Sequence, residues 1–375
     1  MNVALSTSVM QRGKSGVGQY VLALTRALLD HVNEVNFSLL VLEEDIPLFD
    51  FARDKMRIVP VAEKWRPAVK NILWHQTALP GWIAKNKIDV LHVPSYRRML
   101  HKAPCKLVST IHDLAPFHVR GKYDFARMFY GRVVVKSLAR KQDQIIAVST
   151  NTARDVQRFF GVPVEQQKII LNGIDHSRFN PGNAKAAKAY AKQRWGLDQR
   201  FFLYVSRLEH PAKNHVRLIE AFDHFKKLTG SPWQLVLAGS DWHGAEHIHA
   251  AVKASPFTGD IRTLGFVEDA VLPDLYRAAS CMTYPSLFEG FGLPPVEAMA
   301  CGTSVISSIA GSLDEVVGNA AQIVNPEDVH DIAEALRLIA STPDRRTQLV
   351  HGGLENAQRF DWSKNAGQVM AAYQA

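Results

Sequence analysis

The chain has 375 residues and a formal net charge of +8, with 47% apolar and 21% charged residues, which is ordinary for a globular protein and excludes a disordered chain. It contains no run of about 18 apolar residues and no basic, apolar leader, so we expect neither a membrane-spanning helix nor a signal peptide. Its three widely spaced cysteines (Cys105, Cys281 and Cys301) indicate neither a disulfide framework nor a zinc site, and a reducing cytoplasm fits best.

A chain of this length is too long for one compact core, so two domains are expected. Short apolar runs alternate with helix-like segments, which predicts parallel sheets covered by helices. In the first half, the predicted strands are Val3–Ser6, Phe37–Leu42, Val90–His92, Lys106–Ile111, Gln144–Val148 and Lys168–Leu171. The predicted helices there include Val17–Leu29, Trp74–Lys85 and Thr152–Phe160.

The second half repeats this alternation. Its predicted strands are Phe201–Ser206, Gln234–Gly239, Arg262–Phe266, Cys281–Tyr284 and Ser304–Ser307. Its predicted helices are His215–Leu228, Leu272–Ala279, Val296–Ala300 and Val329–Ile339. A polar, turn-rich segment starts at His176, so we predict an N-terminal domain over 1–180 and a C-terminal domain over 181–359. Residues 360–375 are predicted to form a helix capped by Asp or Ser.

A glycine-rich segment containing Gly13, Gly16 and Gly18 lies between the first strand and the first helix. Glycines at a helix start can admit a phosphate or a sugar, although a simple turn would also use them. The segment is not a P-loop, because Ser8 stands where that motif needs a glycine. The glycine spacing also excludes a dinucleotide-binding fingerprint.

The positive charge is concentrated in the first half of the chain. From Arg97 to Lys141 there are 11 basic residues, against only Asp113 and Asp124. Such a surface could bind anionic lipid, a phosphorylated acceptor or nucleic acid, or it could be solvated without any partner. Within the same stretch, His112 and Asp113 end a predicted strand. A single histidine is more often structural than functional.

Two glutamates enclose a glycine- and proline-rich turn, Glu289-Gly-Phe-Gly-Leu-Pro-Pro-Val-Glu297. The glycines allow close backbone approach to a ligand, and Pro294 and Pro295 suit the first turn of a helix. The helix N-terminus suits a phosphate, and carboxylates accept hydrogen bonds from sugar hydroxyls. The segment therefore predicts a nucleotide-sugar pocket, with Glu289 on a loop and Glu297 in the first helical turn. The alternative is a solvated Glu289 and a Glu297 that only complements the helix dipole.

Two cations follow the first strand of the second half, in Ser206-Arg-Leu-Glu-His-Pro-Ala-Lys213. The charge of a departing nucleoside diphosphate must be neutralised by a metal or by protein cations. Arg207 and Lys213 could both point at such a diphosphate, although two cations at this spacing could equally be surface residues. No Asp-x-Asp motif lies at a plausible strand end, so we expect a reaction without metal or other cofactor.

The segment Glu289–Glu297, followed by Ala298-Met-Ala-Cys-Gly-Thr-Ser-Val-Ile306, closely resembles the E-x7-E signature of glycosyltransferase family four, whose members share the GT-B fold. The resemblance implies an α/β fold of two Rossmann-like, doubly wound domains that face a cleft. It also implies that the C-terminal helix crosses back to an acceptor-binding N-terminal domain, while the C-terminal domain binds the nucleotide sugar. The implied reaction is a retaining hexosyl transfer.

The resemblance also implies roles for individual residues. Glu289 would contact the donor sugar, and Glu297 would hold the ribose. Arg207 and Lys213 would bind the diphosphate, and His112 would contact the sugar while Asp113 orients its loop. The remaining implied donor-binding positions are the loop glycines Gly16 and Gly18, the turn residues Phe291, Gly292 and Leu293, and Val267, whose backbone would cup the nucleobase.

The segment Trp74–Pro80 resembles family members that transfer mannose, so GDP-mannose is the first expected donor and a UDP-sugar the second. We expect a glycan or lipid-linked glycan acceptor and no nucleic acid partner. The basic N-terminal surface could contact anionic lipid on the cytoplasmic side of a membrane. Alternatives are a GT-B sugar-nucleotide epimerase, a phosphorylase, or a non-catalytic nucleotide-sugar-binding or membrane-surface scaffold subunit.

Overall fold

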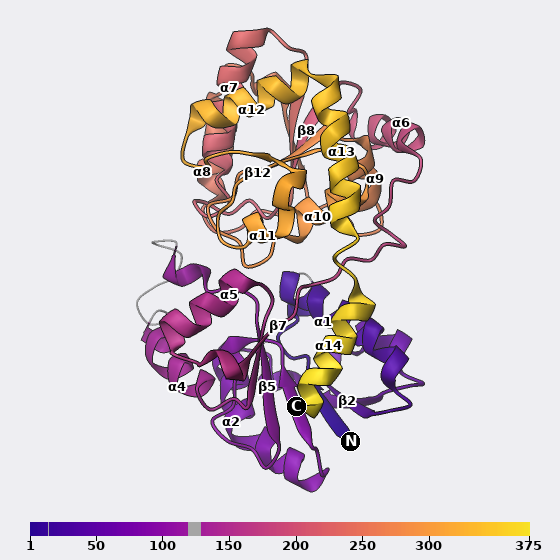
Figure 1. Ribbon diagram of the computed structural model, residues 1–375, viewed down its shortest axis with the longest axis vertical. Coiled ribbons are helices and arrows are strands. Elements are labelled where there is room, and N and C mark those ends of the chain that lie inside the picture. Colours follow the sequence, from indigo (N-terminus) through magenta and orange to yellow (C-terminus); the bar gives the residue numbers. More distant parts are fainter. Residues whose placement is uncertain (14, 119–128) are drawn as a thin grey trace. The chain divides into compact units, whose positions relative to one another are not determined.

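The computed structural model describes residues 1–13, 15–118 and 129–375. The chain divides into two compact units (Figure 1). Unit 1 comprises Met1–Gly173 and Asp361–Ala375, and unit 2 comprises Ile174–Phe360. Part of the predicted basic stretch and one residue of the glycine-rich segment lie outside the described residues: Lys14, Arg120, Lys122, Asp124 and Arg127.

Unit 1 is built on a seven-stranded parallel sheet in the order β3-β2-β1-β4-β5-β6-β7. The strands are β1 (Asn2–Ser6), β2 (Asn36–Leu42), β3 (Arg57–Val61), β4 (Val90–Val93), β5 (Lys106–Ile111), β6 (Gln144–Ala147) and β7 (Gln167–Ile169). The chain adds strands first on one side of β1 and then on the other, so the winding direction reverses between β1 and β4.

The α-helices in the described part of unit 1 are α1 (Gly16–Leu28), α2 (Ala68–Lys85), α4 (Lys136–Ala139), α5 (Thr150–Asp155) and α14 (Trp362–Gln374). Alternate residues of β1 point to opposite faces of the sheet, as the pleat requires. Val3 and Leu5 belong to the core cluster under α1 and α14, whereas Ala4 belongs to the cluster under α2.

The last helix, α14, completes unit 1 by packing against α1 (Figure 1). The Asp361 side chain accepts hydrogen bonds from the N–H groups of Ser363 and Lys364, which confirms the predicted cap. At the other end, the Tyr373 hydroxyl lies 2.7 Å from Nδ1 of buried His92. The Tyr373–His92 contact and the apolar face of α14 thus attach this last helix to the first sheet.

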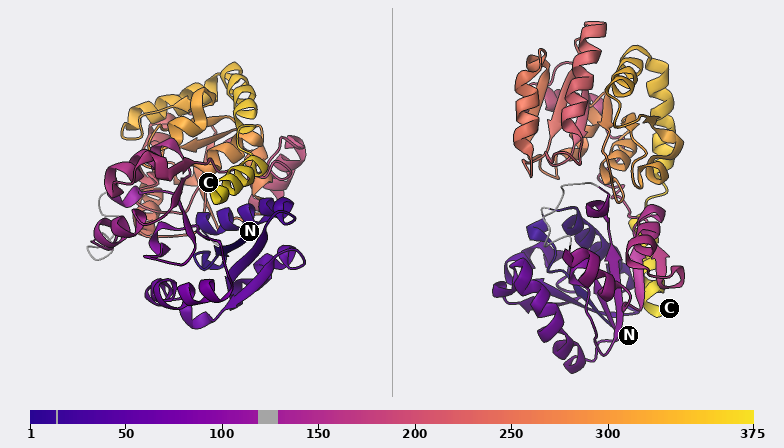
Figure 2. Two further views of the ribbon diagram at one scale, coloured as in Figure 1. Left: turned by 60° about the horizontal axis from the view of Figure 1, so that its bottom comes forward. Right: turned by 90° about the vertical axis from the view of Figure 1, so that its left-hand side faces the viewer.

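Unit 2 contains a six-stranded parallel sheet in the order β10-β9-β8-β11-β12-β13, which reverses between β8 and β11. Its strands are β8 (Phe201–Val205), β9 (Gln234–Ala238), β10 (Ile261–Gly265), β11 (Cys281–Tyr284), β12 (Val305–Ser307) and β13 (Gln322–Ile323). Its α-helices are α6 (Ala184–Trp195), α7 (His215–Thr229), α8 (Ala245–Ala254), α9 (Leu272–Ala278), α10 (Leu293–Ala300), α11 (Leu313–Val317), α12 (Val329–Ser341) and α13 (Pro343–Ala357). Helices lie on both faces of each sheet (Figure 2).

The two sheets confirm the predicted class of two Rossmann-like, doubly wound units. The strand β3 was not predicted, because Pro60 interrupts its apolar run, and it lies at the edge of the sheet, where a proline is tolerated. The helix α10 begins at Leu293 rather than at Val296, because Gly292 adopts a left-handed φ of 95° immediately before it. Glu297 therefore lies in the second helical turn, and its expected place in the first turn was wrong.

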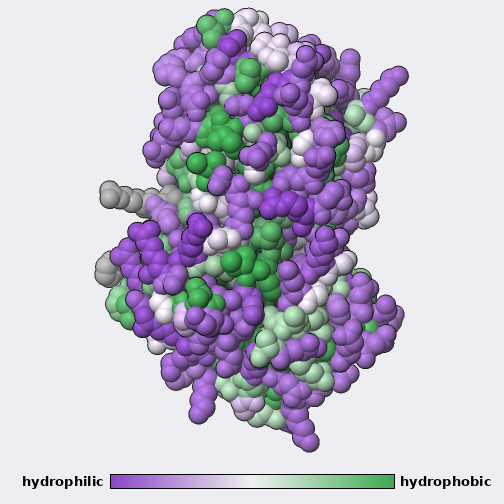
Figure 3. Space-filling model, viewed as in Figure 1, coloured by the Kyte–Doolittle hydropathy of each residue, from purple (hydrophilic) through white to green (hydrophobic). Residues whose placement is uncertain are grey.

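Among the described residues, no helix has the length and apolar character needed to span a membrane. The face of the molecule shown in Figure 3 is largely hydrophilic, with scattered apolar side chains.

Candidate active site

The predicted charged residues of unit 2 gather where its sheet reverses direction. Strands β8 and β11 are neighbours, and both end at the same edge of the sheet. Arg207 and Lys213 lie on the loop that follows β8, and Glu289 lies on the loop that follows β11. Open α/β sheets bind ligands at this kind of position, outside the carboxyl ends of the strands.

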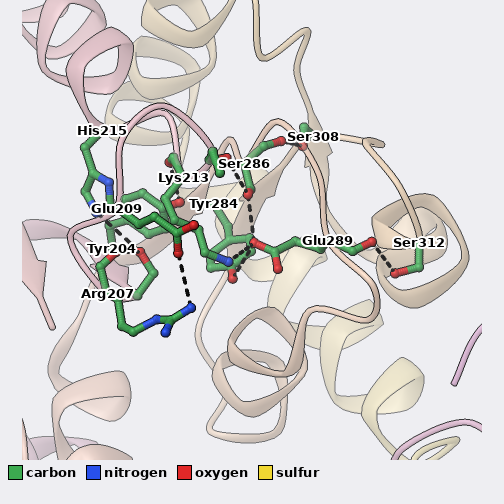
Figure 4. Close-up of polar contacts among 12 residues, drawn as sticks. Tyr204, Arg207, Glu209, Lys213, His215, Tyr284, Ser286, Glu289, Ser308 and Ser312 are labelled. Carbon is green, nitrogen blue, oxygen red and sulfur yellow. Dashed lines mark hydrogen bonds and ion pairs between the residues drawn. The ribbon is translucent and has the colours of Figure 1, made fainter. Parts of the chain in front are cut away.

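The Glu289 carboxylate is held by three donors (Figure 4). Its Oε1 accepts hydrogen bonds from Lys213 Nζ at 2.6 Å, Ser286 Oγ at 2.7 Å and the Tyr284 hydroxyl at 2.9 Å. The side chains of Glu289 and Lys213 are only 12% and 15% exposed. Among the described residues, Oε2 has no hydrogen-bond partner, so one oxygen of a firmly oriented carboxylate is left for a ligand.

Two buried tyrosines stay protonated beside this carboxylate. Burial raises the pKa of both Tyr204 and Tyr284 well above the usual value, and the charge of Glu289 raises it further. The Tyr204 hydroxyl donates to the carbonyl oxygen of Lys213 at 2.5 Å. The tyrosines therefore act as fixed donors, one to the glutamate itself and one to the loop that carries the lysine.

The backbone of Glu289 is fixed as firmly as its side chain. Its carbonyl oxygen accepts hydrogen bonds from both the N–H and the hydroxyl of Ser312, each at 3.0 Å. Gly311 has a φ of 70°, and a Cβ there would lie 2.2 Å from the same carbonyl oxygen. Only glycine fits this position, because another residue would meet both the strained φ and a backbone clash.

Arg207 lies at the outer side of the β8 loop. Its guanidinium stacks over the Trp242 ring at 4.6 Å and donates from Nη2 to Glu209 Oε2 at 3.1 Å. The side chain remains 43% exposed. Stacking and one ion pair leave several of its five N–H donors available for an anionic ligand.

The second glutamate of the motif, Glu297, lies in a different environment. Its Oε2 accepts a hydrogen bond from the Tyr276 hydroxyl at 2.9 Å. Burial raises the pKa of Glu297 to about 7, against the opposing effects of Tyr276 and Arg178. A carboxylate with this environment does more than complement the dipole of α10. It can exchange its proton near neutral pH or accept a hydrogen bond from a ligand hydroxyl.

The turn between the glutamates brings backbone rather than side chains to the site. A Cβ at Gly292 would lie 2.5 Å from Leu313 Cδ2. The Phe291 side chain is buried and meets Phe360 edge-on, so this residue can offer a ligand only its backbone. Because Pro294 and Pro295 have no N–H, the start of α10 offers a phosphate fewer donors than the sequence suggested.

Val267 follows β10, near the edge of the sheet. Gly265, two residues earlier, still accepts a sheet-like hydrogen bond from Gly239 at 2.8 Å. Within the described part of the chain, the backbone of Val267 makes no hydrogen bond to other backbone groups. Its N–H and carbonyl are thus available to a ligand, as backbone recognition of a base would need.

His112 lies in unit 1, at the end of β5. Its Nε2 is 3.2 Å from the carbonyl oxygen of Pro94, so this nitrogen carries the hydrogen and Nδ1 is the acceptor. Burial lowers the pKa of His112 to about 4, so the ring is neutral at pH 7. Asp113 accepts a hydrogen bond from the N–H of Ala115 at 2.9 Å, which fits its predicted role in orienting the loop.

The two glycines of unit 1 differ in their surroundings. A Cβ at Gly18 would lie 2.5 Å from the carbonyl oxygen of Met10, so packing alone explains this glycine. The N–H of Gly18 also donates to the capping hydroxyl of Ser15 at 3.0 Å. A Cβ at Gly16 would meet nothing within 4 Å. Of these two glycines, only Gly16 adjoins open space among the described residues at the start of α1.

Sequence reasoning missed the residues that hold the site together. Tyr284 and Ser286 lie within a few positions of Glu289, so their proximity was a usable signal. Ser312 follows a glycine just before a helix, which marks a tight turn but not its partner. Tyr276 is on α9, and no short motif connects it with Glu297.

Comparison with known proteins relates both units to glycosyltransferases. Residues 187–356 match the family model described as glycosyl transferases group 1, and residues 14–178 match the one described as glycosyltransferase family 4. The O-antigen chain mannosyltransferase B of Escherichia coli is 30% identical over 298 residues, covering 78% of this chain and 76% of that protein. A D-inositol 3-phosphate glycosyltransferase of Kribbella flavida is 28% identical over 335 residues, covering 87% of this chain and 75% of the relative.

A solved structure, Anabaena Alr3699/HepE in complex with UDP and glucose, matches all of this chain and 99% of that one, with a TM-score of 0.79 and 18% sequence identity. At this identity the likeness concerns the fold alone, and it confirms the GT-B fold. The family models and the Escherichia coli relative identify the family. This chain belongs to the group 1 glycosyl transferases of glycosyltransferase family four, and it is a retaining glycosyltransferase that uses a nucleotide sugar.

Proposed function

We propose that this enzyme transfers a hexose to a glycan or lipid-linked glycan without a metal ion, with mannose from GDP-mannose as the first candidate donor and a UDP-sugar as the second. The Escherichia coli mannosyltransferase supports mannose. The Anabaena structure with UDP and glucose supports the second donor. The segment Trp74–Pro80 adds no further support, because Trp74 and His75 are buried within α2.

The observation that carries the proposal is the Lys213–Glu289 pair at the reversal point of the second sheet. An oriented carboxylate with one free oxygen suits a sugar hydroxyl, and the adjacent ammonium suits a phosphate. Arg207 adds a second cation for the diphosphate. Together the two cations provide the charge stabilisation that a metal ion supplies in other transferases.

The other predicted residues take positions around the same donor. Glu297 accepts a hydrogen bond from the ribose, and the backbone of Val267 cups the base. The N–H of Leu293 and the backbone of Phe291 and Gly292 approach the diphosphate. In the same proposal, unit 2 binds the donor and unit 1 binds the acceptor, which corresponds to the domains predicted over 181–359 and over 1–180 with 360–375.

The chemical step is a substitution at the anomeric carbon of the donor sugar. The acceptor hydroxyl oxygen forms the new bond to this carbon on the same face from which the diphosphate leaves, so configuration is retained. The bond between the anomeric carbon and the phosphate oxygen breaks, and the departing phosphate takes the acceptor's proton. His112, neutral with Nδ1 as acceptor, binds a hydroxyl of the donor sugar, and the loop with Gly16 and Gly18 approaches the same sugar.

Glu289→Gln tests the assignment of the site. The substitution keeps the size of the side chain but removes the charge that orients Lys213. We expect sugar transfer to fall by about 100-fold or more, as for loss of one preorganised polar group, while the affinity for the nucleoside diphosphate changes by only a few-fold. Glu334→Gln, an exposed carboxylate of the same unit, is the control. Transfer by Glu289→Gln at the wild-type rate would remove this residue from the site.

The donor is tested by comparing how GDP, UDP, ADP and dTDP raise the unfolding temperature. The largest shift with GDP is expected, and a larger shift with UDP would contradict GDP-mannose in favour of the second candidate. Incubation with nucleotide sugar alone separates transfer from epimerisation. An epimerase would yield a new sugar nucleotide without any acceptor, which would contradict transfer as the main reaction.

The basic surface of unit 1 supports a contact with anionic membrane. Phe129 and Val133 are 55% and 52% exposed, and Arg132, Lys136 and Arg140 lie on the same segment. Apolar side chains among cations suit the interface of an anionic bilayer. Co-sedimentation with vesicles should require anionic lipid and should weaken in Val133→Asp. Binding that is equal with neutral and anionic vesicles would rule out this contact.

A further inference from the structure

Among the described residues, Arg98 is a cation without a carboxylate partner. It ends the short turn Tyr96–Arg98 that follows β4. Its Nε donates to Asn71 Oδ1 at 2.6 Å, and its Nη1 donates to the carbonyl oxygen of Arg97 at 3.2 Å. Both acceptors are neutral, and within the described ranges no carboxylate forms an ion pair with Arg98. Burial lowers the pKa of Arg98, the nearby Tyr130 opposes this by raising it, and the charge of adjacent Arg97 lowers it again.

The described residues that contact the Arg98 guanidinium are held by hydrogen bonds, and none of them is a carboxylate. Asn71 Oδ1 also accepts a hydrogen bond from Ser8 Oγ at 3.3 Å, and Asn71 Nδ2 donates to the carbonyl oxygen of Trp65 at 3.0 Å. The backbone carbonyl of Asn71 accepts from Nδ1 of His75 at 2.8 Å. Burial lowers the pKa of His75 to about 3, so this ring is neutral. Every neighbour that fixes the guanidinium is thus itself uncharged or cationic.

Another partly buried arginine of unit 1 shows the usual arrangement. Arg66 has a side chain that is 23% exposed, and it forms ion pairs with Asp45 and Glu63. Placing a guanidinium in a partly desolvated site without such a partner is unfavourable unless a ligand supplies the negative charge. Arg98 has the geometry of a binding residue, because its Nη2 remains without a hydrogen-bond partner among the described residues.

The position of Arg98 in the fold strengthens this argument. Ser8 follows β1 and Arg98 follows β4, and these two strands are the neighbours between which the first sheet reverses direction. The corresponding position of unit 2 carries Lys213 and Glu289. Ligands bind outside the strand ends at such reversal points, so both sheets of the chain present polar side chains at their expected binding edges.

We propose that Arg98 binds a phosphate group of the acceptor through the N–H groups of its guanidinium that have no hydrogen-bond partner among the described residues. The proposal rests on the glycosyltransferase function proposed above and narrows its acceptor to a phosphorylated molecule. A guanidinium presents paired N–H donors that match phosphate oxygens, and a fixed orientation increases the gain from each hydrogen bond.

The test uses the full chain saturated with its nucleoside diphosphate, so that the donor's own phosphate site is filled. Inorganic phosphate is then titrated in by calorimetry. We expect phosphate to bind saturably to the wild type and at least tenfold more weakly to Arg98→Gln. Arg98→Lys should bind phosphate with intermediate affinity, because it keeps the positive charge but lacks the paired N–H donors of a guanidinium. Arg53→Gln, an exposed arginine of the same unit, should bind phosphate like the wild type.

A second measurement separates this proposal from the proposed function. Slow hydrolysis of the nucleotide sugar needs no acceptor, so the wild type should hydrolyse the donor whether or not phosphate binds at Arg98. Absence of hydrolysis and of nucleotide binding in the wild type would count against the proposed function itself. Intact hydrolysis with no phosphate binding to the wild type, or equal binding by Arg98→Gln and Arg53→Gln, would overturn the acceptor site. If Arg98→Gln does not fold, unchanged binding by Arg98→Lys would overturn it as well.

Discussion

The pair formed by Lys213 and Glu289 should stabilise unit 2 measurably, because it is both short and poorly exposed. The Nζ–Oε1 distance is 2.6 Å, and the side chains are 15% and 12% exposed. A hydrogen bond to a charged group contributes about 1.5–3 kcal/mol, and breaking a buried ion pair by removing one partner costs about 3–5 kcal/mol. Because Glu289 keeps its bonds from Ser286 and Tyr284, we expect a coupling energy of about 1.5–3 kcal/mol.

The assay is a double-mutant cycle with Lys213→Met, Glu289→Gln and the combined variant, each unfolded in urea. The chain offers a matched control in Arg53 and Asp50, whose charged atoms are also 2.6 Å apart but whose side chains are 60% and 61% exposed. The same cycle there should give about 0.2–1 kcal/mol at most. Equal coupling energies in the two pairs would refute the reasoning, since the shortest distance between charged atoms is the same and the prediction rests on the difference in burial.

Three further outcomes are expected. The pKa of Glu297 in the folded chain, about 7, lies above its usual value of 4.5, so the free energy of unfolding should fall as pH rises between these values. In urea unfolding between pH 5 and 8, Glu297→Gln should remove about 1–3 kcal/mol of that fall. Parallel pH profiles of the wild type and the variant would contradict this prediction. Gly311→Ala should lower sugar transfer at least tenfold, because its Cβ would clash with the carbonyl oxygen of Glu289. The control is Gly230→Ala, where φ is 58° and a Cβ would meet nothing within 4 Å. This control should lower the free energy of unfolding by only about 1–2 kcal/mol and leave sugar transfer unchanged. Tyr373→Phe should lower the free energy of unfolding by about 1–3 kcal/mol by leaving His92 Nδ1 buried without a partner, and an unchanged unfolding curve would count against this contact.

The regular elements of the chain could be predicted because their signals are local. Buried parallel strands are short apolar runs, and most helices between them show the helical period. The order of elements then places the ends of β8 and β11 at one edge, so the sequence could place Arg207, Lys213 and Glu289 on loops at that edge. Their actual contacts could not be predicted, since the hydrogen bonds of Glu289 depend on side-chain directions that no spacing rule supplies.

Two features illustrate what sequence reasoning lacks. The start of α10 depends on the φ of Gly292, and a shift of three residues was enough to misplace Glu297 by one turn. The basic stretch that begins at Arg97 was visible as composition, but composition does not show which cation has a carboxylate beside it. That distinction needs the three-dimensional neighbours of Arg98, which come from α2 and from the segments that follow β1 and β4.

The return of α14 to unit 1 determines when this chain can finish folding. Unit 2 is one continuous stretch, so all of its residues have been synthesised before the ribosome reaches Asp361. The first sheet, although made first, lacks the Tyr373 partner of His92 Nδ1 and the helix that covers α1 until α14 has been synthesised. A chain whose synthesis stops before Asp361 would thus contain a complete second unit and an unfinished first unit, whose exposed apolar face would favour aggregation or degradation.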